Sequence, residues 1–399
     1  MNARHARGLE IAHFKEIKRE GNVWIIPSQT TSKKYTVTLF PQVCSCPDFE
    51  AHGIPCKHIY AAEATLALES GQPVPLPVKR ARVTYKQEWQ AYNQAQTNEK
   101  AKFQELLYAL CQNIEDLPRK NINAGRSRLP LGEMIFCVVF KTYSLLSGRR
   151  FISDLKEAQR RGYISKTPHF NSIFNYLELP EMTPFLKELI IESSLPLKSV
   201  EWDFAVDSSG FSTGQFMRWF DTKYGKGEMI KEQWLKAHIM CGCKTNVVTS
   251  VEITDGTAGD SPHFKPLVET TAKNFTMDSV CGDKAYSSSP NLQLVLVKGG
   301  VPYIPFRSNT SPDDKRSTST WKRMFHFFSY NQEMFMRHYH KRSNVETTFS
   351  MIKAKFGERL RSKTGIAQKN ELLCKILAHN LCCLIQSMYE LGVEPEFGQ

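Results

Sequence analysis

The sequence predicts a multidomain α/β protein, and three observations support this prediction. Residues 1–80 hold two short β-strand patterns, one helical pattern and a cluster of cysteines with a histidine. Residues 81–198 show mostly the helical periodicity of apolar residues. In residues 199–399 several strands come first and helices then alternate with strands, which is typical of a mixed α/β core. We therefore expect a small N-terminal module, a helical region and an α/β domain.

The composition fits a large protein with a polyanionic partner. The 399 residues are 41% hydrophobic, which is enough for two or three domains with sizeable cores. Lys and Arg number 52 against 40 Asp and Glu, and the formal net charge of +12 favours nucleic acid first and an anionic membrane second. No apolar run is expected to reach the ~18 residues of a membrane span. The N-terminal residues do not resemble a secretion signal.

The N-terminal module carries a compact set of metal-ligand side chains. Val23–Ile26 and Tyr35–Leu39 are predicted strands, and Ile59–Leu68 is a predicted helix. Three thiols and one imidazole occur between them in two close pairs, which is a tetrahedral zinc set: Cys44, Cys46, Cys56 and His58. A two-strand, one-helix unit has little core, so a structural Zn²⁺ would contribute directly to its folding. The alternative is a set of buried cysteines without a metal.

The same four ligands carry a family resemblance. The pattern Cys-x-Cys…Cys-x-His is similar to the SWIM zinc finger, and the resemblance covers the whole module. The spacing of one residue within each pair fits that family. The resemblance implies that the module binds DNA or a partner protein, and the sequence does not choose between the two.

The helical region contains a candidate helix-turn-helix. Ser153 can cap a helix that ends at Gly162, and Thr167 with the following proline can start a second helix over Phe170–Leu177. This pair is surrounded by basic residues, which suits an element that binds DNA. These residues are Arg149, Arg150, Arg160, Arg161 and Lys166. The alternative is an all-α connector with a solvated basic face.

A predicted helix near the C-terminus gathers polar side chains on one face. At about 100° per residue, four of them fall within an arc of roughly 60°: Tyr339, Arg342, Glu346 and Lys353. The adjacent arc is apolar and can pack on a core. A carboxylate can ligate a divalent metal, and Arg and Lys can hold phosphates. The alternative is an ordinary amphipathic helix with an Arg342–Glu346 ion pair.

Two aspartates stand at the ends of predicted strands. The stretch Glu201–Asp207 alternates apolar and polar residues, so Asp203 and Asp207 share one face, and Ser208–Gly210 is predicted to end this strand directly after Asp207. The stretch Ser279–Asp283 is a predicted short buried strand with the aspartate last. Three other aspartates compete for the same roles: Asp203, Asp260 and Asp278.

Three motifs resemble those of the DDE transposases of prokaryotic insertion sequences, and they occur in the order of that group. Val-Asp207-Ser-Ser-Gly-Phe and Gly-Asp283-Lys-Ala-Tyr resemble the first and second acidic motifs. The third is Tyr-x2-Arg-x3-Glu-x6-Lys, formed by the four polar residues of the C-terminal helix. The resemblance spans most of residues 200–385. It implies a ribonuclease-H-like core in residues 199–399, with a basic insertion at about 307–335.

The resemblance also implies a chemistry. Asp207, Asp283 and Glu346 would hold two Mg²⁺ or Mn²⁺ ions, with Asp207 bridging both. The enzyme would cleave the ends of a mobile element and join the 3′-hydroxyl ends to target DNA. The other members of the signature would contact DNA near the scissile bond: Arg342, Lys353 and Tyr339.

The implied partners and the rival functions complete these expectations. Double-stranded DNA is the expected partner, bound by a homodimer or a higher multimer in the cytoplasm of a prokaryote, at the nucleoid. One rival function is a domesticated DNA-binding regulator that moves nothing, and the intact acidic triad argues against it. The other is a metal-dependent nuclease without strand transfer, which would use the same residues.

Overall fold

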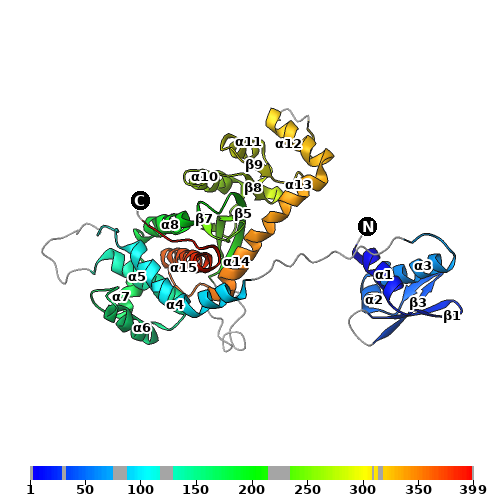
Figure 1. The fold of residues 1–399 in the computed structure, drawn as a ribbon, viewed down its shortest axis with the longest axis horizontal. Helices are drawn as coiled ribbons and strands as arrows, with labels where there is room; N and C mark the ends of the chain where they lie inside the picture. The colour runs from blue at the N-terminus through cyan, green and yellow to red at the C-terminus, as the bar shows by residue number, and fades with distance from the viewer. Residues whose placement is uncertain are drawn as a thin grey trace, which may run out of the picture. The chain divides into compact units, whose positions relative to one another are not determined.

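The computed structural model describes residues 3–28, 33–74, 88–116, 129–213, 234–307, 310–312 and 318–397. The chain forms two compact units, Met1–Lys86 and Gln87–Gln399 (Figure 1). The domain limit that we predict at residue 80 lies near this division. The limit at residue 198 lies inside the second unit, so it separates two sections of one compact body, and both limits stay predictions.

The first unit is a four-stranded antiparallel sheet with three helices. The strands pair in the order β1-β2-β3-β4. They are β1 (Lys18–Glu20), β2 (Val23–Pro27), β3 (Lys34–Leu39) and β4 (Gln42–Cys44), and the helices are α1 (Ala3–Phe14), α2 (Pro47–His52) and α3 (Lys57–Glu69). The prediction of two strands and one helix was therefore incomplete. The two missed strands have three residues each, too few to show an alternating pattern.

The core of this unit is small and includes the metal-ligand thiols. Ile26, Val37 and Ile59 are fully buried, and the three cysteines are packed into the same apolar cluster. Helix α1 lies directly on α3, and Gly8 permits this approach. A Cβ at Gly8 would lie 2.6 Å from the Cβ of Tyr60, so any larger residue there would force the two helices apart.

The second unit begins with helices that surround a long C-terminal helix (Figure 1). Helices α4, α5, α7 and α8 all contact α15, which ends the described fold. The elements are α4 (Trp89–Cys111), α5 (Leu131–Ser144), α6 (Gly148–Arg160), α7 (Phe170–Leu177), α8 (Met182–Ser194), η1 (Leu195–Leu197) and α15 (Gly365–Leu391).

A mixed five-stranded sheet follows, in the order β7-β6-β5-β8-β9. Its first three strands, β5 to β7, pair antiparallel; β8 then pairs with β5 in parallel, and β9 pairs with β8 in parallel. The strands are β5 (Asp203–Ser212), β6 (Trp234–Gly242), β7 (Val248–Asp255), β8 (Ser279–Gly282) and β9 (Val301–Tyr303). The accompanying helices are α10 (Ser261–Ala272), η2 (Lys284–Tyr286), α11 (Ser289–Val297), α12 (Ser319–Tyr330), α13 (Gln332–Tyr339), η3 (His340–Arg342) and α14 (Ser343–Phe356). This arrangement confirms the predicted α/β fold class.

Helices cover both faces of the sheet, and alternate residues of β5 show which helix lies on which face. Ser208 donates a hydrogen bond to Asp260 at the start of α10, at 2.7 Å. Its neighbour Asp207 faces the opposite side, where Arg342 precedes α14. Because successive side chains of a strand point to opposite faces, α10 and α14 lie on opposite faces of the sheet.

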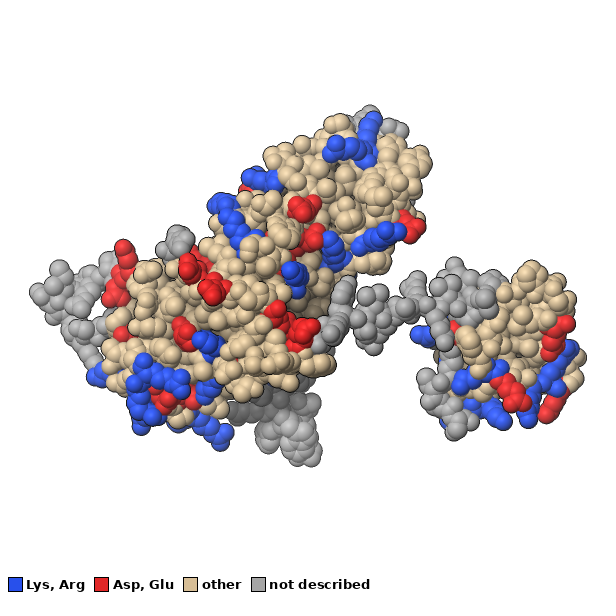
Figure 2. Space-filling view, in the orientation of Figure 1, with Lys and Arg blue, Asp and Glu red and all other residues tan. Residues whose placement is uncertain are grey.

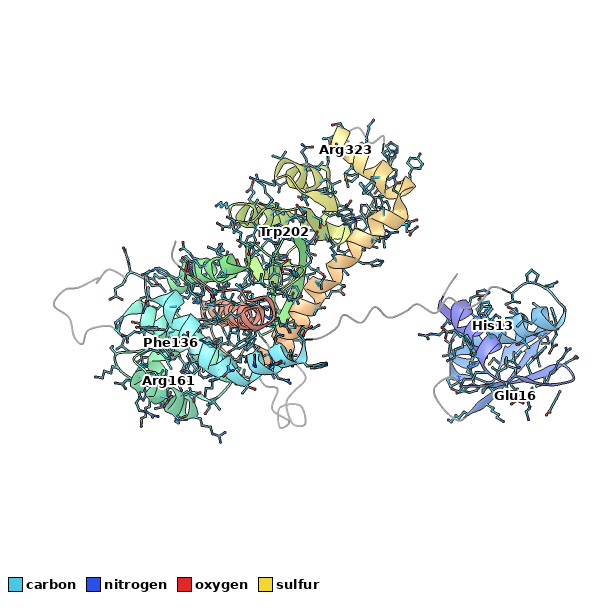
Figure 3. All side chains as sticks on the ribbon, viewed as in Figure 1. His13, Glu16, Phe136, Arg161, Trp202 and Arg323 are labelled. Atoms are coloured by element: carbon cyan, nitrogen blue, oxygen red, sulfur yellow. The ribbon has the colours of Figure 1, made fainter. Side chains whose placement is uncertain are left out.

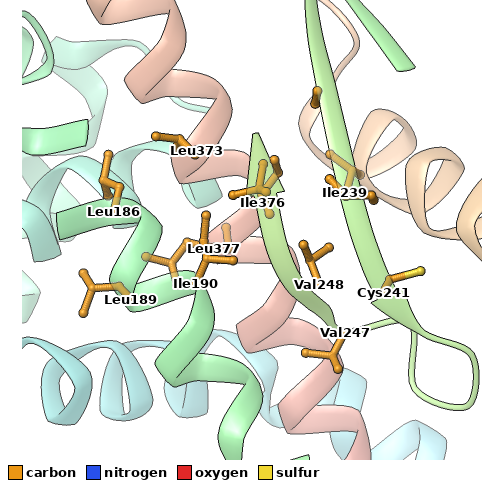
Figure 4. Close-up of a cluster of buried hydrophobic side chains, with 14 of the residues drawn as sticks. Leu186, Leu189, Ile190, Ile239, Cys241, Val247, Val248, Leu373, Ile376 and Leu377 are labelled. Atoms are coloured by element: carbon orange, nitrogen blue, oxygen red, sulfur yellow. The ribbon is translucent and has the colours of Figure 1, made fainter. Parts of the chain in front are cut away.

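One continuous core joins the helical section to the sheet (Figure 4). Ile190 of α8, Val248 of β7 and Leu377 of α15 are fully buried side by side. Asn380 of α15, also fully buried, donates its amide to the carbonyl oxygens of Val248 and Ile190 at 2.7 and 3.1 Å. Its Oδ1 accepts the Val248 N–H at 2.8 Å. A single amide thus satisfies backbone groups of two elements, which fixes α15 against both.

Helix α15 corrects one expectation. Among the described residues, Gly365–Leu391 is one helix that is long and apolar enough to cross a membrane, although we expected no such run. The structure gives a different reason for its apolar character, because 78% of the apolar window is buried inside the protein. A helix surrounded by protein on most sides is apolar all round for the same reason as a membrane span.

Candidate active site and zinc centre

Asp207 lies within β5 rather than at its end, which corrects the predicted strand boundary. The strand continues to Ser212, and Ser208 and Gly210 pair with His238 and Lys236 of β6. Gly210 is needed for packing rather than for a turn. A Cβ at this position would lie 3.0 Å from the ring of Trp234, so the glycine makes room for the indole.

The two aspartates come together because of how β5 and β8 pair. The parallel ladder ends with Val206 opposite Gly282. Asp207 and Asp283 are the next residue of each strand, so they occupy neighbouring positions where the pairing ends. Asp283 also accepts a hydrogen bond from the N–H of Lys284 and caps the short helix η2.

The C-terminal signature does not form one continuous α-helix, which corrects a second prediction. Tyr339 ends α13, and the turn η3 follows before α14 begins at Ser343. Side chains occupy carbonyl groups that a continuous helix would use. Asn344 Nδ2 donates to the carbonyl of Lys341 at 2.9 Å, and Ser343 Oγ donates to that of His340 at 2.9 Å. Such side-chain bonds compete with the regular helix ladder.

Arg342 connects two of the three acidic residues. Its Nη1 donates to Asp207 Oδ2 at 2.9 Å, and its Nη2 donates to Glu346 Oε1. The predicted i,i+4 ion pair is therefore present, and a carboxylate from β5 joins it. The guanidinium group of Arg342 lies between the two carboxylates and balances part of their negative charge. A divalent cation bound at this place would have the same effect.

The third carboxylate belongs to the same electrostatic site. Burial raises the pKa of Asp207 above its usual value, and the charges of Asp283 and Glu346 act in the same direction. Burial also raises the pKa of Tyr339, and Asp283 and Glu346 contribute to that shift. Asp283 and Glu346 therefore lie near enough to act electrostatically on Asp207 and Tyr339, but the three carboxylates are not within single-ion distance of one another as the zinc ligands are. The raised pKa means that the ionised form of Asp207 is disfavoured in the protein alone. A cation bound at this site would stabilise that form.

Lys353 lies further along α14 and is engaged differently. Its Nζ pairs with Glu358 Oε1 at 2.8 Å and lies 5.2 Å from the centre of the Phe211 ring. Both predicted phosphate-binding cations, Lys353 and Arg342, thus hold carboxylates in this structure. Binding of DNA phosphates would require them to exchange those partners.

Two of the three competing aspartates are engaged by other groups, and the third, Asp278, is exposed. Asp203 accepts from Lys341 Nζ at 2.6 Å and also from the hydroxyl of Ser279. Asp260 pairs with Lys236 Nζ at 2.6 Å on the opposite face of the sheet. Asp207 is also paired, with Arg342, but the charges of two further acids, Asp283 and Glu346, act on it, and this favours Asp207 over both as a metal ligand.

Sequence reasoning missed a buried histidine on that opposite face. His238 is fully buried, stacks on the ring of His263 at 4.3 Å and lies 3.4 Å from Asp260 Oδ1. Burial lowers its pKa to about 4, and the charge of His263 adds to the effect. No sequence pattern marks this cluster, because its members come from β6 and α10, which meet only in the fold.

The zinc ligands converge in the first unit. One ligand atom from each side chain lies within 4.8 Å of all the others: Cys44, Cys46, Cys56 and His58. His58 Nδ1 is 3.9 Å from the Cys44 sulfur and 3.8 Å from the Cys56 sulfur. Four ligands at about 2.3 Å around a tetrahedral ion would be about 3.8 Å apart. Among the described residues, this is the one group of at least three such side chains close enough for a single ion.

The electrostatics of this cluster also fit a cation. A hydrogen bond from Cys44 lowers the pKa of Cys56 to about 4, and the same contact raises the pKa of Cys44. The buried thiols therefore share protons when they have only one another as partners. A Zn²⁺ ion would replace these protons and charge-balance the thiolates. The Cys₃His set, its burial and its spacing all fit structural zinc.

Helices α6 and α7 form the predicted helix pair. Helix α7 has the predicted bounds, whereas α6 begins earlier than predicted and the cap residues of both helices differ. Ser153 lies inside α6, where its hydroxyl donates to the carbonyl of Arg150 at 2.8 Å. Helix α6 begins after Ser147, and α7 begins after His169, whose Nδ1 accepts the N–H of Asn171 at 3.3 Å. These caps were missed because neither fits a capping pattern with its partner three residues on.

The surface around these helices is basic and hollowed. Lys and Arg gather over the α6–α7 end of the second unit (Figure 2), and Arg161 lies at the surface while Phe136 of α5 lies in the core (Figure 3). A cavity of about 690 Å³ lies beside the turn between them. Its lining includes Arg149, whose guanidinium lies 5.2 Å from the ring of Phe170, together with Lys166 and His169.

Comparisons with known proteins cover the two segments that contain these sites. Residues 198–381 match the family model of the transposase DDE domain, and residues 35–67 match that of the SWIM zinc finger. The chain therefore carries a DDE transposase domain preceded by a SWIM zinc finger. Such a domain implies a DNA-binding polynucleotidyl transferase that uses Mg²⁺.

A solved structure is also similar in part. The cryo-EM structure of the piggyBac transposase synaptic complex with hairpin DNA is 12% identical, with 80% of this chain and 79% of that chain covered and a TM-score of 0.34. No curated protein matches the chain significantly.

Proposed function

We propose that this protein is a DNA transposase that cleaves the ends of a mobile element and joins the resulting 3′-hydroxyl ends to target DNA. The observation that carries the proposal is the meeting of Asp207 and Asp283 at the end of the β5–β8 ladder, with Arg342 and Glu346 facing Asp207. The signature in residues 339–353 supports an origin in a prokaryotic insertion sequence, whose transposase would act on DNA in the cytoplasm.

We assign metal binding to the three acids. Asp207, Asp283 and Glu346 supply only carboxylate oxygens, which are the ligands that Mg²⁺ prefers. When bound, Mg²⁺ or Mn²⁺ would activate the attacking hydroxyl and stabilise the charge that develops on the transferred phosphoryl group. The chain's own part is to hold the carboxylates near one another in a partly buried site, where Arg342 lies between Asp207 and Glu346.

The side chains of Arg342 and Lys353 would then bind phosphates of the DNA backbone. Arg342 can bind a backbone phosphate once Asp207 and Glu346 have another positive partner, because its fork fits a phosphate as well as a carboxylate. Lys353 can do the same after leaving Glu358. Tyr339, half-buried beside Arg342, would orient the same strand. These exchanges couple DNA binding to metal binding without a large movement of the backbone.

Two regions outside the triad support binding of the element ends. The basic surface and the cavity at α6 and α7 suit the binding of a DNA duplex. Arg149 and Lys166 could contact its phosphates there. The zinc finger is a second candidate for DNA or protein contact. Cleavage of two ends by one assembly would require a homodimer or a higher multimer.

One experiment separates this proposal from its two rivals. The full chain with Zn²⁺ is incubated with Mg²⁺ and DNA that carries candidate element ends, and the products are resolved on a denaturing gel. Joined products support the transposase, cleavage alone indicates a nuclease without strand transfer, and binding alone indicates a DNA-binding regulator. Calcium in place of magnesium serves as the control for binding without cutting.

A further inference from the structure

A second cavity lies away from the triad. It has a volume of about 540 Å³ and lies where the end of α5, the loop into α6, the end of α7 and the loop 357–364 before α15 meet. Its apolar wall includes Leu146, Phe174 and Phe356. Its volume is within the range of small-molecule sites, which is roughly 300–1,000 Å³.

The lining of this cavity has an excess of positive charge. Four cationic and two acidic side chains contribute to it: Lys141, Arg361, Lys363, Lys375, Glu178 and Glu371. Glu371 is already used, because it accepts the backbone N–H groups of Arg361 and Ser362 and pairs with Lys375 at 3.6 Å. The positive charge of the other lining residues is therefore left without an equal negative charge.

Lys141 shows this imbalance most clearly. Within the described part of the chain, its ammonium forms no hydrogen bond or ion pair. Burial lowers its pKa below the usual value, and the nearby charge of Arg361 lowers it further. The charge of Glu371 partly offsets these effects, but a partly buried cation that forms no ion pair and lies beside a second cation costs stability, which is expected where an anionic ligand completes the site.

Two of the four cations around the cavity, Lys375 and Arg361, are held in place. Buried Lys375 donates to the carbonyl oxygens of Gly357 and Arg359 at 2.9 and 2.8 Å and fixes the loop before α15. Arg361 Nη1 donates to the carbonyl of Leu145 at 3.2 Å, which connects this loop to the α5–α6 loop. The site is thus formed before any ligand arrives, which reduces the entropy that binding would cost.

We propose that this cavity binds a nucleotide, with its phosphate against Lys141, Arg361 and Lys363 and its base against the apolar wall. Cations at one side and apolar side chains at the other match a ligand with one charged and one planar part. The nucleotide comes either from a DNA end or from the free pool. The proposal rests on the proposed function, because DNA supplies the first of these sources.

The test uses the full chain with zinc and measures the binding of dAMP by isothermal titration calorimetry. Lys141→Met should weaken dAMP binding about tenfold or more, the loss expected for one charge-assisted hydrogen bond. The same variant should melt at the wild-type temperature or higher, because an unpaired buried cation is removed. Lys298→Met, which removes an exposed lysine outside the cavity, should change neither quantity. Deoxyadenosine, which lacks the phosphate, should bind weakly and equally to all three proteins.

A competition experiment identifies the source. If a single-stranded oligonucleotide displaces dAMP, the nucleotide belongs to DNA; if the two bind together with independent affinities, a free nucleotide is the ligand. Either result supports the cavity as a nucleotide site. Equal dAMP affinity of wild type and Lys141→Met, or no dAMP binding up to about 10 mM, would overturn the proposal.

Failure of this proposal can be told from failure of the proposed function. If the wild type cuts DNA with Mg²⁺ and Lys141→Met binds dAMP normally, only the cavity assignment is wrong. If the wild type neither binds nor cuts DNA, yet dAMP binding depends on Lys141, only the proposed function is wrong.

Discussion

The zinc finger and the acidic site hold their candidate ligands in opposite ways. In the finger, four ligand atoms from residues 44–58 lie within 4.8 Å of one another, and the thiols contact one another and the ring of His58. In the acidic site, the charges of Asp283 and Glu346 act on Asp207, the three carboxylates are not within single-ion distance, and the guanidinium of Arg342 lies between Asp207 and Glu346. The difference fits a structural zinc ion in the first unit, whereas divalent ions in the second unit would have to compete with the guanidinium of Arg342.

The largest expected effect is on catalysis. Changing Asp207, Asp283 or Glu346 to Ala should reduce cutting of end-bearing DNA by more than about 100-fold, because loss of an outer-shell partner of a metal ligand already costs 10–100-fold. DNA binding in Ca²⁺ and the melting temperature should stay near the wild-type values. A gel assay of cutting with a parallel binding assay gives both readouts, and normal cutting by any one variant would remove that residue from the site.

The next effect concerns the first unit alone. Removing zinc with a chelator, or changing Cys56 to Ser, should unfold Met1–Lys86 and leave Gln87–Gln399 folded, since structural zinc supplies much of the folding free energy of so small a core. Limited proteolysis of the full chain should then release fragments from the first unit only. If the first unit resists protease equally with and without zinc, its apolar core is sufficient to keep it folded without the metal.

A smaller effect tests whether the second unit depends on pH. Burial lowers the pKa of His379 to about 4, while its unfolded value is 6.5, so the unfolded chain binds more protons between these values. Stability is therefore full above about pH 6.5 and falls as the pH decreases towards 4, by about 3 kcal/mol from this residue.

The variant His379→Gln isolates this contribution. Its amide can still donate to the carbonyl of Asn246, which His379 Nε2 contacts at 2.9 Å. Urea unfolding of both proteins across this pH range should show a weaker pH dependence in the variant. If the free energy of unfolding depends on pH in the same way in both proteins, His379 takes up its proton in the folded protein at little cost, and the predicted contribution is absent.

The smallest effect concerns Arg342 itself. Replacing it with Gln leaves Asp207 and Glu346 without a positive partner, and should cost about 1 kcal/mol without divalent ions, as expected for a partly exposed ion pair. Added Mn²⁺ should then stabilise the variant more than the wild type. Lys353→Met, which breaks a pair that involves none of the three acids, is the matched control and should respond to Mn²⁺ as the wild type does.

The sequence was sufficient where the chemistry is local. The four zinc ligands occupy one short segment with a characteristic spacing, so the site followed from the order of residues alone. The acidic motifs were also recognisable, but Ser208–Gly210 was taken for the end of a strand. The structure shows that Gly210 is small because Trp234 of β6 needs the space, and a cross-strand contact of this kind is invisible in one sequence.

The remaining features could not be predicted mainly because they depend on contacts between segments far apart in the sequence. The turn η3 arises partly because Asn344 and Ser343 take backbone carbonyls, which helical periodicity does not show. The ion pair of Asp203 with Lys341 and the nucleotide-sized cavity each join elements far apart in the chain. The apolar length of α15 likewise reflects its burial among helices on several sides, a property of the assembled fold.

The most direct test of the account is Mn²⁺ binding to the full-length, zinc-loaded chain, followed by electron paramagnetic resonance. Asp207→Asn should abolish the Mn²⁺ bound by the wild type. Asp203→Asn, a change four residues earlier on the same face of β5, should preserve it, because Asp203 pairs with Lys341. Equal Mn²⁺ binding by wild type and Asp207→Asn would contradict the assignment of the acidic site as the metal centre.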